Sequence, residues 1–411
     1  MRNRSLLVLT AIAATGTLTL TACGSRASNS GSGGSGSGST TVTIGVDAPL
    51  TGSLSALGIG IQNSVDLAVK TANKTNEVPG VTFKIEALDD KAAPQQGSLN
   101  ATQLVGDSSV VGVVGPLNSG VALTMQKTFN NANLVEVSPA NTNPALTQGP
   151  NWQTGTKARP FASYFRTATT DAIQGPFAAQ FAFSTLGKKK VFLVDNKDAY
   201  GVGLVGTFKD EFTKLGGTVA GQDHVTSGAS DFSSTVNAIK SSGADFVYFG
   251  GEYPDAAPLT KQLKAQGVNI PMIGGDGNYD PTYIKLAGTA SNGDFATSVG
   301  APVESLPSAQ TFVANYKAGG YSQAYGAYGG YSYDSAWAII EAVKAVVSAN
   351  NGKLPSDPRQ AVEKAMSNVN FSGVTGTVSF DQYGDATNKQ LTVYGVKNGV
   401  WTTIKTGTFS G

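Results

Sequence analysis

Cysteine and histidine are almost absent from this 411-residue chain, which contains only Cys23 and His224. A zinc site built from cysteine and histidine needs three or four ligands, so such a site is excluded, as is a disulfide within the chain. A serine or cysteine nucleophile would have to use His224 as its base or do without histidine. The 29 basic and 28 acidic residues balance each other, so we expect no basic surface for nucleic acid.

Familiar catalytic and cofactor motifs are missing as well. The chain contains no GxSxG nucleophile elbow, no Walker loop and no HExxH pair. Gly58-Ile59-Gly60 lacks a third glycine at the spacing of a dinucleotide-binding loop, and it comes late after its strand. We therefore expect that the protein is not an enzyme and binds no metal or cofactor.

No hydrophobic run is long enough for a comfortable transmembrane helix. The most apolar segment, residues 6–20, is interrupted by threonines and follows Arg2 and Arg4. It ends in Leu20-Thr21-Ala22-Cys23, which resembles a bacterial lipobox. The resemblance implies that residues 1–22 are a signal peptide and that Cys23 carries a two-chain lipid anchor, which is enough for stable membrane attachment. The alternative is an ordinary signal peptide with an incidental cysteine.

Residues 23–40 comprise this cysteine and a segment rich in glycine and serine, a composition that cannot bury a core and behaves as a flexible tether. Beyond it, strands and helices alternate. Strands are expected at 41–49, 81–89, 109–115, 134–138, 189–196, 218–225, 244–251 and 271–275, and helices at 58–73, 94–105, 120–132, 171–186, 203–215, 232–241 and 255–266. This alternation is typical of parallel sheets with right-handed crossovers, and its repetition predicts two α/β lobes.

The last third of the chain has a different pattern. We expect helices at 308–317 and 333–350 and strands at 375–381, 390–398 and 400–405, with a hairpin turn at Asn398-Gly399. Pattern alone does not assign these elements to a lobe.

Ligands of parallel α/β sheets bind at the carboxyl ends of strands, so the loops that follow the strands are the candidate sites. In the first loop, Gly115-Pro116-Leu117-Asn118-Ser119-Gly120, Ser119 occupies the expected N-cap position of the next helix. A helix N-terminus suits a carboxylate, and the flanking glycines would allow close backbone approach. The bland interpretation is a serine that only caps the helix.

Two further loops carry polar groups. Ser138-Pro139-Ala140-Asn141-Thr142 is a rigid segment in which Thr142 offers both a hydroxyl and a backbone N–H, or else it is simply a polar turn. Asp276 lies among glycines after a short apolar strand, where its carboxylate can meet an ammonium group, although Asp-Gly is also a common turn signal.

Other polar residues are weaker candidates. Glu252 and Tyr200 follow strands, and Asp171 starts a helix, where capping is the simple explanation. Tyrosines at 321, 325, 328, 331 and 333 precede the long helix, and one or two of them could line a pocket. The pair Asp89-Asp90 is expected to be solvated, and His224 to be structural or exposed.

Seven segments together resemble the branched-chain amino-acid-binding family, the Leu/Ile/Val type of periplasmic solute-binding proteins. In chain order they are IGVDAPLTGSLSALG, VVGPLNSG, VSPANTNPALT, FRTATTDAIQGP, VFLVDNKDAYGVG, VYFGGEYPD and IGGDG, and TGTVSFDQYGD resembles the family's tail. The resemblance implies a type I periplasmic-binding fold, in which two Rossmann-like lobes with parallel sheets are joined by a three-crossing hinge. It places 41–166 with about 297–375 in the N-terminal lobe, and about 167–296 with 376–411 in the C-terminal lobe.

The same resemblance implies a binding site for an amino acid. The ligand carboxylate would meet the hydroxyl and N–H of Ser119 and the N–H of Thr142, and its ammonium would meet Asp276, the Ala140 carbonyl and the Thr142 hydroxyl. Other residues would line or border the cleft, namely Leu57, Asn118, Asn141, Asp171, Tyr200, Glu252 and Tyr328. Asn118 and Glu252 are polar where an aliphatic side chain would lie, so a polar amino acid, urea or another small polar solute stays open unless the two residues pair elsewhere.

These expectations describe a receptor of an ABC importer, lipid-anchored on the extracytoplasmic face of the bacterial membrane and partnered by permease domains. An extracytoplasmic sensor with the same fold is the alternative. A secreted α/β enzyme is disfavoured because no nucleophile–base set, metal cluster or cofactor loop is found.

Overall fold

The computed structural model describes residues 39–409, so Cys23 and the expected signal peptide lie outside the described residues. Two mainly parallel sheets organise this part of the chain. The first has the order β2-β1-β3-β4-β5 and is entirely parallel. Its strands are β1 Thr40–Ala48, β2 Val81–Asp89, β3 Val110–Val114, β4 Val135–Ser138 and β5 Tyr164–Arg166.

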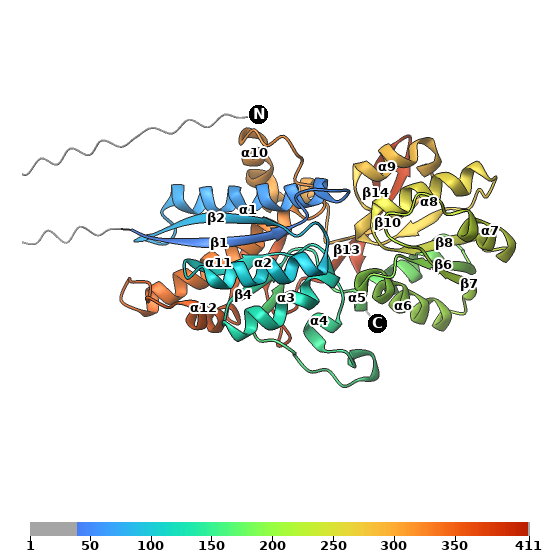
Figure 1. Ribbon diagram of the computed structural model, residues 1–411. Helices are drawn as coiled ribbons and strands as arrows, with labels where there is room; N and C mark the ends of the chain where they lie inside the picture. The colour runs from blue at the N-terminus through green and yellow to red at the C-terminus, as the bar shows by residue number, and fades with distance from the viewer. Residues whose placement is uncertain (1–38, 410–411) are drawn as a thin grey trace, which may run out of the picture. The chain divides into compact units, whose positions relative to one another are not determined.

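Helices cover both faces of this sheet, and its inner strands β1, β3 and β4 are accordingly buried on both sides. Figure 1 shows α1 (Ser55–Thr75) and α2 (Pro94–Gly106) on opposite sides of β1 and β2. α3 (Ser119–Asn131) packs beside α2, and α11 (Gly329–Ala349) packs beside α1. Smaller elements accompany them, namely α4 Ala145–Gln148, α10 Gln310–Ala318, α12 Arg359–Met366 and the hairpin of β11 Asn370–Gly373 and β12 Gly376–Ser379.

The second sheet has the order β14-β13-β10-β9-β8-β6-β7. Its parallel strands are β6 Lys190–Asp195, β7 Thr218–His224, β8 Phe246–Gly250, β9 Met272–Gly274 and β10 Phe295–Val299. An antiparallel hairpin completes it, formed by β13 Gln390–Lys397 and β14 Val400–Thr408. Its helices are α5 Asp171–Gln180, α6 Ala199–Lys214, α7 Ser233–Ser242, α8 Tyr253–Ala265 and α9 Pro281–Ala287.

Most expected elements are confirmed within a few residues, including the hairpin turn, where Asn398 and Gly399 both have positive φ as a type I′ turn requires. The short elements β5, β10, β11, α4, α9 and α12 were not expected. The long helix begins at Gly329 rather than Tyr333, so Tyr331 and Tyr333 lie inside it and not before it. Glycine is a poor helix former, but an added Cβ at Gly329 would lie 2.4 Å from the Tyr325 Cβ and 2.9 Å from the Ser64 hydroxyl, so close packing favours glycine there despite that preference.

The chain passes between the two sheets three times within residues 39–409. The passages follow β5, follow β10, and join β12 to β13. The expected boundaries at about 297 and 376 fall inside β10 and at the start of β12.

A buried ion pair holds two of these passages together. Arg166, at the end of β5, donates from Nε to the Asp385 carboxylate at 2.7 Å, and both side chains are at most 1% exposed. The other guanidinium nitrogens bind the carbonyls of Asn141 and Asn143 at 2.9 Å and the Thr147 hydroxyl. Burial alone would raise the pKa of Asp385, but the Arg166 charge and the Gln148 amide outweigh it and hold that pKa below its usual range.

We predict that Arg166→Met lowers the free energy of unfolding by about 3–5 kcal/mol, because it leaves the Asp385 charge buried without its partner. Chemical denaturation at pH 7 measures the loss. Since the pKa of Asp385 is lower in the folded protein, the loss should persist above about pH 4 and shrink as the pH falls further. Lys344→Met is the control, because Lys344 and Glu77 form a partly exposed pair whose removal costs about 1 kcal/mol or less. Similar losses in both variants would contradict the prediction.

Candidate functional site

A small cavity lies where the carboxyl ends of strands from both sheets meet. Its volume is about 10 Å³, roughly the room that one water molecule needs. Eight of the residues expected at the site line it, namely Leu57, Asn118, Ser119, Ala140, Tyr200, Glu252, Asp276 and Tyr328, together with Leu117 and Gly277. Asn141 and Thr142, in the loop that contains Ala140, and Asp171, at the start of α5, are buried but do not line the cavity.

Ser119 is not an N-cap, contrary to expectation. Helix α3 begins at Ser119 itself, Asn118 occupies the N-cap position, and neither side chain caps the helix. The Ser119 hydroxyl is buried and has no hydrogen-bond partner among the described residues. Its backbone N–H, as the first of the helix, also lacks an intrahelical acceptor. Two donors at one helix terminus are therefore directed at the cavity region.

The two glycines that flank this loop have different surroundings. Gly115 has φ +131°, and a Cβ atom there would lie 2.1 Å from the Asp47 carbonyl oxygen, so the close approach is to β1 and not to a ligand. Gly120 has open space around it, because an added Cβ would lie 4.0 Å from its nearest neighbour, Pro94. Gly115 is therefore needed for packing against β1, and the close approach of a ligand to these glycines stays a prediction.

The loop after β4 is held rigidly from behind. The Asn141 side chain donates to the Leu117 carbonyl at 2.7 Å and accepts from the Tyr164 hydroxyl at 2.9 Å, so it supports the loop. Arg166 binds the loop's carbonyls. The Thr142 hydroxyl is buried and lacks a hydrogen-bond partner of good geometry among the described residues. The loop therefore presents Ala140 and Thr142 at a fixed position.

Asp276 is held by three neutral donors. The hydroxyls of Tyr200 and Tyr328 donate to its two carboxylate oxygens at 2.7 and 2.8 Å, and the Gln174 amide donates at 2.9 Å. Glycine at position 275 makes room for Tyr200, whose hydroxyl would lie 2.3 Å from an added Cβ. No basic side chain among the described residues pairs with Asp276. Burial raises its pKa, and the three hydrogen bonds oppose that shift.

Gln174 also connects Asp276 to a second buried acid. Its amide nitrogen donates to Asp171 at 3.0 Å, and its oxygen accepts from the backbone N–H of Asp276 and from the Thr297 hydroxyl. The second carboxylate oxygen of Asp171 has no partner of good geometry among the described residues. Burial, together with the Asp276 charge, raises the pKa of Asp171 to about 8. The site therefore has more acidic groups than it has counter-charges.

Glu252 and Asn118 pair with each other across the cavity. The Asn118 amide donates to one carboxylate oxygen of Glu252 at 2.8 Å, and the Asn196 amide donates to the other at 2.8 Å. Burial raises the pKa of Glu252 to about 8, and the charges of Asp198 and Asp255 add to the shift. The sequence left open whether Asn118 and Glu252 pair with other groups. In the structure they pair with each other, and Asn196 is the second partner of Glu252.

Several weaker candidates resolve differently. Asp90 is fully buried rather than solvated, and only Asp89 of that pair is partly exposed, where it accepts N–H groups from Leu50 and Thr51. His224 lies on the edge strand β7 and pairs with Asp195 at 2.7 Å. Gln174 and Asn196 were missed. Both stand inside segments that resemble the family, but neither has a spacing that points to chemistry.

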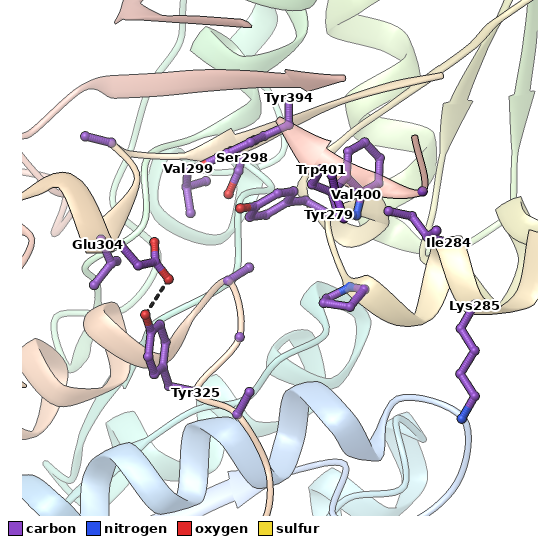
Figure 2. A pocket seen from close by; sticks show the side chains of 17 residues that line it. Tyr279, Ile284, Lys285, Ser298, Val299, Glu304, Tyr325, Tyr394, Val400 and Trp401 are labelled. Carbon is purple, nitrogen blue, oxygen red and sulfur yellow. Dashed lines mark hydrogen bonds between the residues drawn. The ribbon is translucent and has the colours of Figure 1, made fainter. Parts of the chain in front are cut away.

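A second, larger cavity of about 660 Å³ contains none of the expected site residues. In Figure 2 the rings of Tyr279, Tyr394 and Trp401 lie together on one side, and Tyr325 donates to Glu304 on the other. Its lining is mainly apolar, and the polar groups that it does contain, such as Ser298 and Glu304, are not among the buried side-chain atoms that lack a hydrogen-bond partner. We therefore take the smaller, polar cavity as the functional site. The described residues contain no group of three or more His, Cys, Asp and Glu side chains that could hold a metal ion.

Comparison with known proteins gives the same fold. The family model described as periplasmic binding protein matches residues 41–400. The chain belongs to this family. A Leu/Ile/Val-binding protein homolog of Brucella melitensis is 30% identical over 352 residues, which are 85% of this chain and 90% of that protein.

Solved structures of the type I fold superpose well. A leucine binding protein of Thermotoga maritima has a TM-score of 0.78 and 27% identity, and the match covers 89% of this chain and 98% of that one. A branched-chain amino acid transporter substrate binding protein of Streptococcus pneumoniae, solved with isoleucine, has a TM-score of 0.77 and 24% identity, with 90% and 99% covered. The expected α/β fold of this family is therefore confirmed.

We predict that Asp171→Asn stabilises the protein increasingly as the pH rises from 5 to 8. A carboxyl with a raised folded-state pKa stays protonated to higher pH than in the unfolded chain, so the wild type loses up to about 1.4 kcal/mol per pH unit in this window. The neutral amide does not pay that penalty. Chemical denaturation at pH 5 and pH 8 measures the gap, and the exposed Asp231→Asn is the control. A gap that is the same at both pH values would contradict the prediction.

Proposed function

We propose that this protein is the solute-binding lipoprotein of an ABC importer, anchored through Cys23 on the extracytoplasmic face of the membrane, and that its ligand is an α-amino acid. The observation that carries the proposal is the polarity of the small cavity. Asp276 is a buried acid held only by neutral donors, and the buried hydroxyls of Ser119 and Thr142 lie on the loops around the same cavity. An α-amino acid supplies an ammonium group for the acid and a carboxylate for the donors.

The carboxylate would be bound by the Ser119 hydroxyl, by the N–H at the α3 terminus and by the Thr142 N–H, where the helix dipole also favours a negative charge. The ammonium would meet Asp276, the Ala140 carbonyl and the Thr142 hydroxyl. The named ligands of relatives, leucine and isoleucine, support an amino acid as the class.

Ligand entry requires the two lobes to separate, because the cavity is too small for an amino acid. We take one lobe as the first sheet with its helices and the other as the second sheet, with the three passages as the hinge. Hydrogen bonds from Asn118 to Glu252, from Tyr328 to Asp276 and from Tyr253 to the Ser53 carbonyl join the two. Ligand contacts made from both sides would favour the closed arrangement, the one that a permease would recognise. A sensor with the same receptor is the alternative.

A thermal-shift screen against the common amino acids tests the ligand class. A ligand at about 100 times its Kd should stabilise the protein by about 2.7 kcal/mol. Asp276→Asn should abolish the shift while the protein stays folded. Asp334→Asn is the matched control, because Asp334 is an equally buried acid that binds Val374 and Thr375 away from the cavity. It should lose stability and keep its ligand. Absence of any shift would count against the proposal.

The lipid anchor has a separate test. Cys23→Ser in the full-length chain removes the thiol that would carry the lipid, so the protein should move from the membrane fraction to the soluble fraction, as fractionation and immunoblotting would measure. Ser25→Ala, two residues away, should leave the protein with the membrane. Retention of the Cys23→Ser protein in the membrane fraction would refute the anchor. Among the described residues no helix is both long and apolar enough to cross a membrane.

A further inference from the structure

Glu252 is the one acid of the small cavity that the proposed contacts to an α-amino acid leave without a role. Its carboxylate has one neutral donor on each oxygen, from Asn118 and from Asn196. The Asn118 amide nitrogen donates to Glu252, and the Asn118 side-chain oxygen is buried without a hydrogen-bond partner among the described residues. Glu252 and Asn118 both line the cavity.

The charges around Glu252 are all of one sign. Asp198, Asp255 and Asp276 act on it, and no basic residue among the described ones forms an ion pair with it. Its pKa of about 8 reflects this surplus of acid together with burial. The ammonium of an α-amino acid would neutralise the charge of Asp276 and leave the Glu252 carboxylate without a counter-charge.

We infer that the side chain of the ligand carries an N–H or O–H donor, which Glu252 and the Asn118 oxygen bind. The inference rests on the proposed function and narrows it from amino acids in general to those with polar side chains. An aliphatic side chain would exclude water from the Asn118 oxygen and the Glu252 carboxyl and offer neither a hydrogen bond. Burying polar groups in this way costs free energy, and a ligand with a donor group avoids that cost. A site built to bind such a donor rejects the apolar analogue of the same shape strongly.

The donor can be cationic or neutral. A cationic group binds the ionised carboxylate, so its binding expels the proton from Glu252. A neutral amide binds the protonated acid, which both donates and accepts. The two forms differ in their pH dependence, while both require Glu252 and Asn118.

Isosteric pairs of ligands test the inference. Asparagine has nearly the shape of leucine, threonine that of valine, and 2,4-diaminobutyrate that of norvaline. Calorimetry on the full-length protein should give at least tenfold tighter binding for the polar member of at least one pair. For diaminobutyrate, the affinity should rise about tenfold per pH unit well below pH 8, since Glu252 must lose its proton. For asparagine, which shares only the contact of its α-ammonium with Asp276, the affinity should change less steeply with pH.

Variants separate a specificity role from a merely structural one. Glu252→Leu should invert the preference within that pair, so the ratio of the two affinities is the readout. Glu252→Gln keeps the shape, so it reports even where Glu252→Leu does not fold. It should reduce the pH dependence for diaminobutyrate to that seen for asparagine. Asp334→Asn is the matched control, because this buried acid binds the N–H groups of Val374 and Thr375 outside the cavity, and its charge is not among those that act on Glu252. It should leave the ratio unchanged.

Two outcomes would overturn the inference. If the apolar member of every pair binds as tightly as its polar partner, or if Glu252→Leu weakens both members equally, the ligand side chain is not read by Glu252, and the proposed function stands. If no amino acid binds to the wild type, the failure lies in the proposed function and removes the inference with it.

Discussion

A fully buried guanidinium is the constraint on which the site depends. Arg166 cannot lose its charge, so each of its N–H groups needs an acceptor inside the protein. Asp385, two carbonyls of the loop after β4 and a threonine hydroxyl supply them. The strand β5, that loop and the third passage between the sheets are therefore held in one arrangement, in which Ala140 lines the cavity and Thr142 is buried two residues further along the loop.

The cavity itself is built against local stability. Asp171, Asp276 and Glu252 are buried close together, and burial raises the pKa of each. Only amides and tyrosine hydroxyls answer these carboxyls in the described structure. Buried polar groups that lack full compensation are costly, and they concentrate where a protein binds something. A ligand with positive or hydrogen-donating groups would supply these carboxyls with the counter-charges and donors that the protein does not provide.

Much of the architecture was predictable because parallel sheets leave strong local signals. Continuous apolar runs such as residues 110–114 indicate strands covered on both faces, and helical periodicity located α1, α6 and α8. The missed elements are short. β5, for example, has three residues, too few for periodicity to distinguish a strand from a turn. β9 is equally short, but it was expected because glycines follow its apolar residues. The start of α11 was misplaced because two glycines that local preference disfavours are accepted there by packing.

The site could be predicted as a location more fully than as a set of contacts. Polar residues that end successive strands must gather at one edge of a sheet, so the order of elements placed Glu252 with Asp276 on the second sheet and Ser119 on the first. That the two edges face one cleft was implied by the resemblance to the family. The roles of Gln174 and Asn196 were not predictable, because their partners are set by long-range geometry. The same holds for the helix terminus, where a shift of one residue turned Ser119 from a cap into a group with an unused hydroxyl.

The sequence by itself determined the order of strands and helices, the polar loops that follow the strands, and the class of protein to which those loops belong. Only the tertiary structure decided which side chains meet. Asn118 binds Glu252 from 134 residues away, and Arg166 binds Asp385 from 219 residues away. Periodicity and composition report the local exposure of a segment. A hydrogen bond between two distant segments depends on how whole sheets and passages pack, and no local pattern carries that information.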